Sequence, residues 1–263
     1  MYPRILILSL IGLLSACGGG ADAVGPQVSS VYAKSLKYSQ TATIYIIGKY
    51  LRTDMVANAP ACTNPSYGPD STTDTLVLHC KVTKTGALPI TIQEAGGAVL
   101  LTDTLTVPQP QATLITSEGT VVVELYPDKV AATVDNFLGY VNSAYYFKTL
   151  FHRVISGFVV QAGGYTTGPV AKEGQRAPIA LESNKGLSNA RGTLAMARTS
   201  DPNSATSEFF INVVDNSILD YTSPEAPGYA VFGKVISDMA VIDAIAAKPT
   251  GSARGYRMCR RPM

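Results

Sequence analysis

The side chains that could do chemistry in this chain are few, and their types already narrow the reaction. The sequence holds two histidines, four cysteines and no tryptophan among 263 residues. A zinc site would need most of these histidines and cysteines together. His79 and His152 lie far apart, however, and no cysteine accompanies His152. Metal catalysis and a cysteine–histidine nucleophile are therefore disfavoured, and no cofactor is expected.

The most informative stretch covers residues 151–165 and reads FHRVISGFVVQAGGY. It resembles the signature of the cyclophilin family. Further blocks resemble the same family in the same order: ESNKGL at 182–187, RGTLAMAR at 191–198, SATSEFFIN at 204–212 and GYAVFGKV at 228–235. The resemblance covers residues 113–247 and is strongest to the exported bacterial members. It implies a closed eight-stranded antiparallel barrel with two capping helices, and peptidyl-prolyl cis-trans isomerase activity.

Such an isomerase has to twist an amide without breaking a bond. Rotation about the peptide C–N bond faces a barrier of about 18–20 kcal/mol, because resonance makes the bond partly double. For X-Pro bonds the uncatalysed exchange takes tens to hundreds of seconds. The catalyst needs an apolar slot for the pyrrolidine ring and a donor that favours the twisted amide. A millionfold acceleration corresponds to about 8 kcal/mol of differential stabilisation.

The resemblance assigns that donor to Arg153, whose fixed, charged guanidinium would bond the prolyl oxygen or the nitrogen lone pair. The four residues that it implies to be catalytic are Arg153, Phe158, Gln161 and Phe210. Those that it implies to contact the substrate are His152, Val159, Ala197, Arg198, Glu208, Ile218, Leu219 and Tyr229. For His152 a structural hydrogen bond explains the residue better than proton transfer does.

Several of these positions depart from the family's usual residues. Val159 stands where methionine is common, and Tyr229 stands where many members have histidine. Glu208 replaces a glutamine and would add a carboxylate near Arg153 that braces or partly neutralises the guanidinium. Ile218 replaces a tryptophan or phenylalanine, which is expected to weaken cyclosporin-type inhibitors while catalysis persists.

The first residues predict an export signal. Arg4 precedes an apolar run at residues 5–14, which is shorter than the roughly 20 residues that span a bilayer. The sequence LSAC that ends at Cys17 resembles the lipobox of bacterial lipoproteins. We therefore expect residues 1–16 to be a signal peptide, Cys17 to be lipidated, and residues 17–27 to form a glycine-rich tether. The alternative is an ordinary signal peptide with an incidental Cys17.

Export also bears on the remaining cysteines. Cys62 and Cys80 lie in one β-rich region of a chain predicted to enter an oxidising compartment, which favours a disulfide. The loop of about 18 residues that it closes would contribute on the order of 3 kcal/mol. Two buried, reduced thiols are the alternative, and Cys259 is left without a partner.

Residues 28–108 alternate apolar and polar positions and predict strands. The segments with this pattern are 41–48, 75–82, 88–93 and 100–107. Their spacing predicts a small β-sandwich that loosely resembles immunoglobulin-like modules of bacterial surface proteins. We find no catalytic motif in this region and expect His79 to be a surface residue of a strand. We therefore interpret the region as a spacer or binding module. Prolines mark a linker at 109–112.

From residue 113 onward strands mix with helices. We expect a strand at 120–127, a helix at 130–142, and a second helix that Ser237 or Asp238 caps and that buries Ile242 and Ile245. Phe209 should face the core, because neighbouring strand residues point to opposite faces. The basic tail 248–263 shows no apolar alternation, so the last barrel strand is expected to be missing, which leaves an open edge beside the first one.

The overall composition fits a folded protein without a nucleic-acid partner. The chain is 46% hydrophobic and 15% charged, and its formal net charge is +2. We expect a monomeric isomerase on the outer membrane, facing the periplasm or the cell surface. It would act on proline-containing segments of exported proteins and assist their folding. One alternative is an anchored holdase that grips such segments with little or no turnover. Another is an adhesin-like lipoprotein that uses its N-terminal module.

Overall fold

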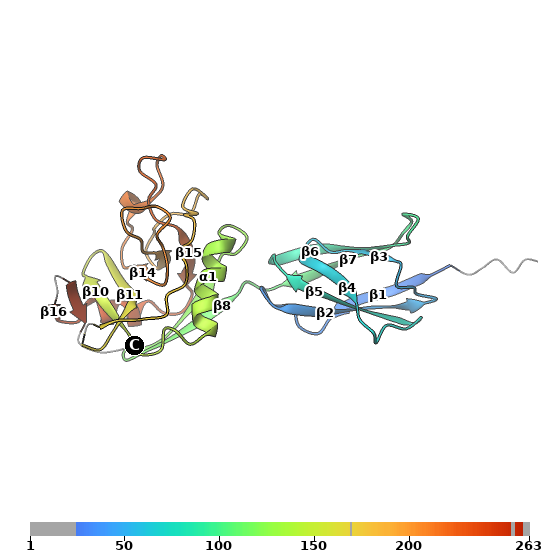
Figure 1. The fold of residues 1–263 in the computed structure, drawn as a ribbon, viewed down its shortest axis with the longest axis horizontal. Helices are drawn as coiled ribbons and strands as arrows, with labels where there is room; N and C mark the ends of the chain where they lie inside the picture. Colours follow the sequence, from blue (N-terminus) through green and yellow to red (C-terminus); the bar gives the residue numbers. More distant parts are fainter. Residues whose placement is uncertain (1–24, 169, 254–255, 260–263) are drawn as a thin grey trace, which may run out of the picture.

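The computed structural model describes residues 25–168, 170–253 and 256–259, so the expected signal peptide and Cys17 lie outside the described residues. Figure 1 shows two β-rich units side by side, with strands β1–β7 in the first and the remaining elements in the second. Each unit has its own apolar core. Within the described ranges no helix is long and apolar enough to cross a membrane.

The N-terminal unit consists of two antiparallel sheets that share one core. The first has the strand order β1 (Gln27–Ala33), β2 (Thr41–Lys49), β5 (Thr75–Val82) and β4 (Cys62–Tyr67). The second has the order β3 (Val56–Asn58), β6 (Gly86–Gln93) and β7 (Val99–Val107). All four strands that the alternation predicted are present, with ends shifted by at most two residues.

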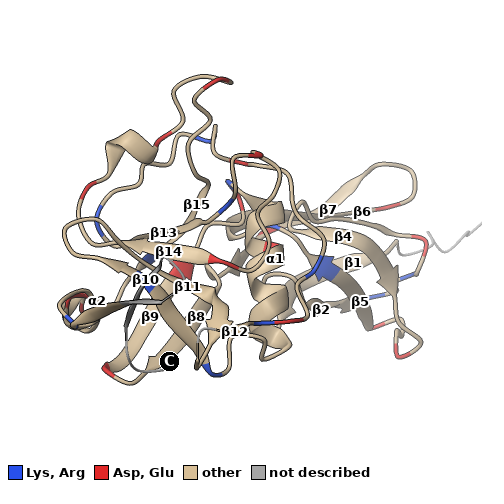
Figure 2. Cartoon of the chain, turned by 60° about the vertical axis from the view of Figure 1, so that its left-hand side comes forward, with Lys and Arg blue, Asp and Glu red and all other residues tan. Residues whose placement is uncertain are grey.

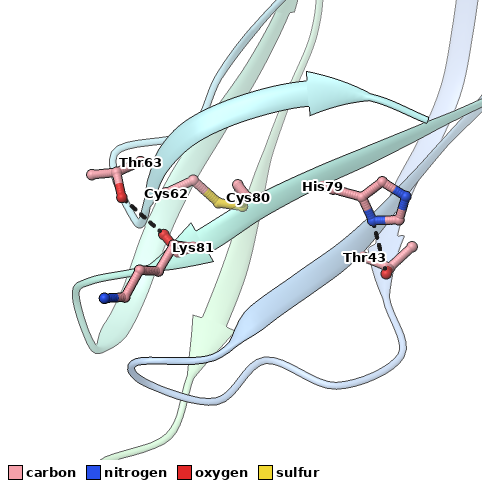
Figure 3. The surroundings of a disulfide bond; sticks show 6 residues. All are labelled: Thr43, Cys62, Thr63, His79, Cys80 and Lys81. Carbon is pink, nitrogen blue, oxygen red and sulfur yellow. Dashed lines mark hydrogen bonds between the residues drawn. A yellow bond between two sulfur atoms is a disulfide. The ribbon is translucent and has the colours of Figure 1, made fainter.

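The apolar face predicted for β5 is buried. Leu76, Leu78, Cys80 and Val82 all lie in the core of this unit. Cys80 is joined to Cys62 of the neighbouring strand by a disulfide with an S–S distance of 2.01 Å, the pairing that the sequence favours (Figure 3). His79 points to the other face of the strand, where its Nδ1 lies 3.2 Å from Thr43 Oγ1. It is half-buried, as expected for a strand residue.

The second unit is built on an antiparallel sheet of eight strands. These are β8 (Gln111–Thr116), β9 (Gly119–Leu125), β10 (Thr149–Ile155), β11 (Val159–Thr166), β12 (Val170–Ala171), β13 (Thr193–Met196), β14 (Phe209–Asn212) and β15 (Val231–Val235). Their order is β10-β11-β14-β13-β15-β9-β8, with β12 paired to β11. The strand expected at 120–127 is thus confirmed as β9, although it ends two residues before Pro127.

Two α-helices pack on this sheet, as expected. In α1 (Ala131–Asn142) Val134 and Phe137 are buried, and the Phe137 ring meets the Phe209 ring edge-on at 5.5 Å. In α2 (Ala240–Ala246) Ile242 and Ile245 are buried. A short 3₁₀-helix, η1 (Ser217–Leu219), precedes β15.

The two candidate capping residues of α2 have different partners. The N-cap residue of α2 is Met239, so neither candidate occupies the N-cap position. Asp238, one residue earlier, accepts a hydrogen bond at Oδ1 from the backbone N–H of Ala240, the first helical residue, at 2.9 Å. Ser237 Oγ instead accepts from the N–H of Val122 in β9 at 3.0 Å.

The C-terminal segment differs from the expectation. Residues 248–263 were expected to supply no strand, and this is wrong. β16 (Thr250–Ala253) and β17 (Tyr256–Cys259) pair with each other, and β17 lies beside β10. A ladder is made by backbone groups, so a strand can form without apolar alternation. Among the described strands, β8 pairs with β9 alone, so it is an edge strand of the sheet. An open edge was expected at the first strand of this unit.

The two units touch through specific side chains. Tyr38 of the N-terminal unit is only 7% exposed and belongs to the core of the second unit. Burial, and then the nearby Asp135 carboxylate, raise the pKa of the Tyr38 hydroxyl. The backbone N–H of Thr85 donates to Asp128 Oδ1 at 3.0 Å, and its hydroxyl donates to Asp128 Oδ2. These contacts join the two units.

Candidate functional site

A cavity of about 260 Å³ opens on the second unit. Its lining comprises Arg153, Phe158, Val159, Gln161, Ala197, Arg198, Phe210, Leu219 and Tyr229. All four residues predicted to be catalytic are among them, together with five of the eight predicted to contact substrate. The tertiary structure therefore collects at one place residues that the sequence distributes over several strands and loops.

Strand register explains the centre of this cavity. Arg153 of β10 lies opposite Gln161 of β11, and Gln161 lies opposite Phe210 of β14. Directly opposed residues in an antiparallel sheet have side chains on the same face and in contact. Phe209 points to the other face and is fully buried, as predicted.

Figure 2 shows that most charged residues of this unit lie on loops, so a charged group on a strand is an exception.

Polar contacts link the residues of this row. Arg153 Nη1 donates to Gln161 Oε1 at 3.2 Å, and Gln161 Nε2 donates to Glu208 Oε2 at 2.7 Å. The Arg153 guanidinium also lies over the Phe158 ring, 5.8 Å from its centroid. Glu208 was expected beside Arg153, but it reaches the guanidinium through Gln161.

His152, Glu208 and Ile218 do not line this cavity. His152 is 1% exposed and its Nε2 lies 3.1 Å from Glu208 Oε2, so it makes the structural hydrogen bond that the sequence favoured. As the strand neighbour of Arg153 it faces away from the cavity. Ile218 is 83% exposed, because successive residues of a 3₁₀-helix point in different directions and here Leu219 faces inward. Burial keeps His152 out of this cavity, whereas the substrate contact predicted for the exposed Ile218 stays a prediction.

Glu208 lines an adjoining cavity of about 360 Å³ that shares Gln161, Ala197 and Arg198 with the first. Burial by itself raises the pKa of this carboxyl, but the hydrogen bond and charge of His152 and the hydrogen bond of Gln161 outweigh it. The pKa of Glu208 therefore lies below its ordinary value of 4.5. At neutral pH the group is a carboxylate.

The opposite wall of the cavity is held by Arg198. Its Nε and Nη2 donate to the carbonyl oxygen of Gly228 at 3.1 and 2.9 Å. Its guanidinium covers the Tyr229 ring at 4.7 Å. The Tyr229 ring in turn meets the Phe210 ring edge-on at 5.5 Å. Arg198 thus holds the Tyr229 ring against the Phe210 ring at the cavity.

Sequence reasoning missed a chain of buried amides behind the cavity. Asn216 Nδ2 donates to the carbonyl oxygen of Phe158 at 2.9 Å and to Asn212 Oδ1 at 2.8 Å. Asn212 Nδ2 donates to Thr193 Oγ1 at 2.9 Å. These contacts fix the backbone that carries Phe158. The available signal was an asparagine at the end of the apolar run FFIN, because a buried amide requires partners.

The donor set of the described residues offers no metal site. No group of three or more histidine, cysteine, aspartate or glutamate side chains in the described ranges could hold a metal ion. The cavity itself combines the guanidinium groups of Arg153 and Arg198 and the Gln161 amide with largely apolar walls. Such a site can bind an apolar ring and stabilise charge next to it, and it contains no nucleophile.

Comparison with known proteins gives consistent matches. The family model described as cyclophilin type peptidyl-prolyl cis-trans isomerase/CLD matches residues 112–259. A peptidyl-prolyl cis-trans isomerase of Streptomyces antibioticus is 50% identical over 146 residues, which cover 55% of this chain and 87% of the relative. Peptidyl-prolyl cis-trans isomerase B of Escherichia coli is 47% identical over 141 residues, covering 53% and 85%.

A solved structure is also similar. The crystal structure of a cyclophilin type peptidyl-prolyl cis-trans isomerase of Cryptosporidium parvum has a TM-score of 0.47 and 24% sequence identity to this chain. The match covers 59% of this chain and 96% of that one.

Proposed function

This chain belongs to the family of cyclophilin-type peptidyl-prolyl cis-trans isomerases and catalyses rotation about X-Pro bonds, and we propose that it does so in the cavity around Arg153. The observation that carries this assignment is the row of Arg153, Gln161 and Phe210 on three adjacent strands, on one face of the sheet. This arrangement favours an enzyme that turns substrate over, rather than a holdase.

In this proposal the apolar part of the cavity binds the pyrrolidine ring. Phe158, Phe210 and Leu219 supply large apolar surfaces, and Val159 adds a smaller one. Burying apolar surface contributes about 25 cal/mol per Å², so the ring anchors the peptide while the preceding amide stays accessible to Arg153. Ala197 and Arg198 would lie along the residues that precede the proline, as an extended segment beside the sheet.

Arg153 supplies the differential stabilisation. As the amide twists, resonance is lost and the prolyl nitrogen acquires a lone pair that can accept a hydrogen bond. The contact with Gln161 holds the Arg153 guanidinium at the cavity before the peptide binds. A donor fixed in advance loses no reorganisation energy when the twisted amide forms, so it favours the transition state over the planar ground state.

The test is isomerisation of a short X-Pro peptide by the full chain and by Arg153→Ala. We expect kcat/KM to fall on the order of 100-fold or more, as for the loss of a preorganised donor, with the melting temperature unchanged. Arg153→Lys keeps the charge without the planar fork and should fall between the two. Full activity of Arg153→Ala would refute the assignment of this cavity.

We further propose that the protein is an exported lipoprotein, attached to the outer membrane through Cys17, that assists the folding of exported chains. The proposal rests on the apolar run at 5–14 and the LSAC sequence before a glycine-rich stretch. Slow X-Pro isomerisation limits the folding of many chains. Mass spectrometry of the N-terminal peptide tests the anchor: an acylated Cys17 is expected, and a cleaved, unmodified N-terminus would contradict it.

For the N-terminal unit we propose an immunoglobulin-like spacer. In Figure 1 the described chain enters this unit through β1, at the end remote from β8, so the unit separates the start of the described chain from the isomerase unit. A spacer would leave turnover of short peptides unaffected when residues 28–108 are deleted. Loss of client binding in that deletion would instead favour a binding module. In the same proposal, β17 beside β10 contributes to closing the sheet into a barrel.

A further inference from the structure

Glu208 is the common acceptor of two side chains from neighbouring strands. Its Oε2 accepts from Gln161 Nε2 on β11 at 2.7 Å and lies 3.1 Å from His152 Nε2 on β10. His152 is almost completely buried, so this support cannot be replaced easily by water. Glu208 directly precedes β14, and its carboxylate thus joins the segment before that strand to β11, which pairs with β14, and to β10, which pairs with β11.

These contacts determine which way the Gln161 amide points. A side-chain amide has a donor at one end and an acceptor at the other, a carboxylate only accepts, and a guanidinium only donates. With Glu208 on one side and Arg153 on the other, only one orientation satisfies both neighbours: Nε2 toward Glu208 and Oε1 toward Arg153. In the reverse orientation the Nε2 donor would face the Arg153 donors, and the Oε1 acceptor would face the Glu208 carboxylate.

We propose that Glu208 is a positioning residue for isomerisation, which locks the Gln161 amide so that its oxygen holds the Arg153 guanidinium at the cavity. Glu208 itself does not line that cavity. Without the carboxylate the amide can rotate, and Arg153 loses a fixed acceptor. The inference rests on the proposed role of Arg153 and extends the site by one residue from outside the cavity.

The groups that face Glu208 keep it ionised at neutral pH. His152 approaches from β10, with the Tyr165 ring 4.7 Å from the imidazole. Arg198 lines the adjoining cavity, and Arg153 lies on the other side of Gln161. Burial raises the pKa of the Tyr145 hydroxyl, and the nearby charge of Glu208 adds to this. The pKa of Glu208 is lowered despite its burial. Protonation turns one of the two acceptor oxygens into a donor and removes the charge, so the lock weakens as the pH falls into the carboxyl range.

Gly164 offers a second way to displace the carboxylate. A Cβ atom at this position of β11 would lie far inside van der Waals contact of Glu208 Oε1. Gly164→Ala therefore pushes the carboxylate away while every charged and hydrogen-bonding side chain stays in the chain. Gly96 of the N-terminal unit is the matched control, because a Cβ there meets no atom within 4 Å.

The experiment measures kcat and KM separately, by NMR exchange on a short X-Pro peptide, for the full chain and four variants. We expect Glu208→Ala and Gly164→Ala to lower kcat about tenfold, the equivalent of about 1.4 kcal/mol, with KM within about twofold. Glu208→Gln keeps an acceptor oxygen and should retain more than about a third of kcat. Gly96→Ala should match the unmodified chain.

A pH profile separates positioning from a structural role. The kcat of the unmodified chain should fall as the pH drops below about 4.5, where carboxyl groups protonate, and Glu208→Gln should lack this decline. An unchanged kcat in Glu208→Ala would overturn the inference. So would a rise in KM alone, which would make Glu208 a substrate contact. If Arg153→Ala keeps full activity, the cavity assignment fails, whatever Glu208 does.

Discussion

Among single residues, Arg198 shows how an ordinary surface group can shape a binding site. Its guanidinium fork holds the Gly228 carbonyl oxygen and covers the Tyr229 ring, which stands against Phe210. The sequence resemblance placed Arg198 along the substrate backbone. The structure adds that it fixes the position of one wall of the cavity.

We expect Arg198→Ala to raise KM about three- to tenfold and to change kcat by less than about twofold. The loss of a charge-assisted hydrogen bond and a cation–π contact is worth roughly 1–3 kcal/mol, and only part of it appears in binding. Steady-state kinetics on a short X-Pro peptide measure both constants. The control is Arg52→Ala, an exposed residue of the N-terminal unit that pairs with Asp54. A lower kcat with an unchanged KM would contradict this role.

At the level of elements, the cavity depends on loops that are tied to each other rather than on strands alone. Asp220, directly after η1, accepts from Ser188 Oγ at 2.6 Å and from the backbone N–H of Asn189 at 2.6 Å. It also accepts from Asn189 Nδ2 at 2.9 Å. This carboxylate joins the loop before β13 to the helix that carries Leu219.

The stability that Asp220 provides should depend on pH. Burial raises the pKa of this carboxyl, but the hydrogen bonds from Ser188 and Asn189 outweigh it, so the pKa lies below its ordinary value of 3.8. A group with a lowered folded pKa stabilises the fold above its unfolded pKa, and this contribution is lost as the pH falls through the folded pKa. We expect the difference in unfolding free energy between the unmodified chain and Asp220→Asn to be largest above about pH 5.

Urea unfolding at a series of pH values measures that difference, which should shrink below about pH 4. The control is Asp74→Asn, an exposed carboxylate of the other unit. A difference that stays constant down to pH 3 would show that Asp220 stabilises by shape rather than by charge.

The disulfide stabilises a different element, the sheet of the N-terminal unit. It closes a loop with a sequence separation of 18 residues, and a loop of this size is worth roughly 2–4 kcal/mol. We expect the double variant Cys62→Ser, Cys80→Ser to lower the unfolding free energy of this unit by that amount. Denaturant unfolding, with and without a reductant, measures it. Equal stability of the oxidised and reduced chain would contradict the prediction.

Regular elements and irregular ones differed in how well the sequence predicted them. The strands at 41–49 and 75–82 were predictable because one buried face imposes a two-residue period. β17 was missed because backbone pairing needs no such period. The outward direction of Ile218 was not predictable, because the direction of a side chain on one turn of 3₁₀-helix depends on what the turn packs against.

For the whole molecule, the main feature is the contact between its two units. Tyr38 inserts into the core of the isomerase unit, and Thr85 makes two hydrogen bonds to Asp128. None of these residues lines the cavity. We therefore expect the interface to couple the stability of the two units without affecting the residues of the cavity.

We expect the double variant Tyr38→Ala, Thr85→Val to separate the two units. A single thermal transition of the unmodified chain should split into two, because the coupling between domains is lost. Truncation of a buried tyrosine should also lower stability by roughly 3 kcal/mol. Calorimetry and small-angle scattering measure the two effects, and kcat/KM should stay within about twofold. Tyr32→Ala, at a half-exposed tyrosine of the same unit, is the control. One unchanged transition in the double variant would contradict the coupling.

The sequence by itself determined the family, the chemistry and all nine residues that line the cavity. A signature such as FHRVISGFVVQ combines a charged donor with apolar residues at fixed spacing. This combination can be recognised in the sequence without knowledge of the fold. The tertiary structure decided how those residues act. It placed Glu208 behind Gln161, turned Ile218 outward and brought Tyr38 into the core of the other unit. Such contacts join residues far apart in the chain, so they depend on packing and register, and local sequence patterns do not encode them.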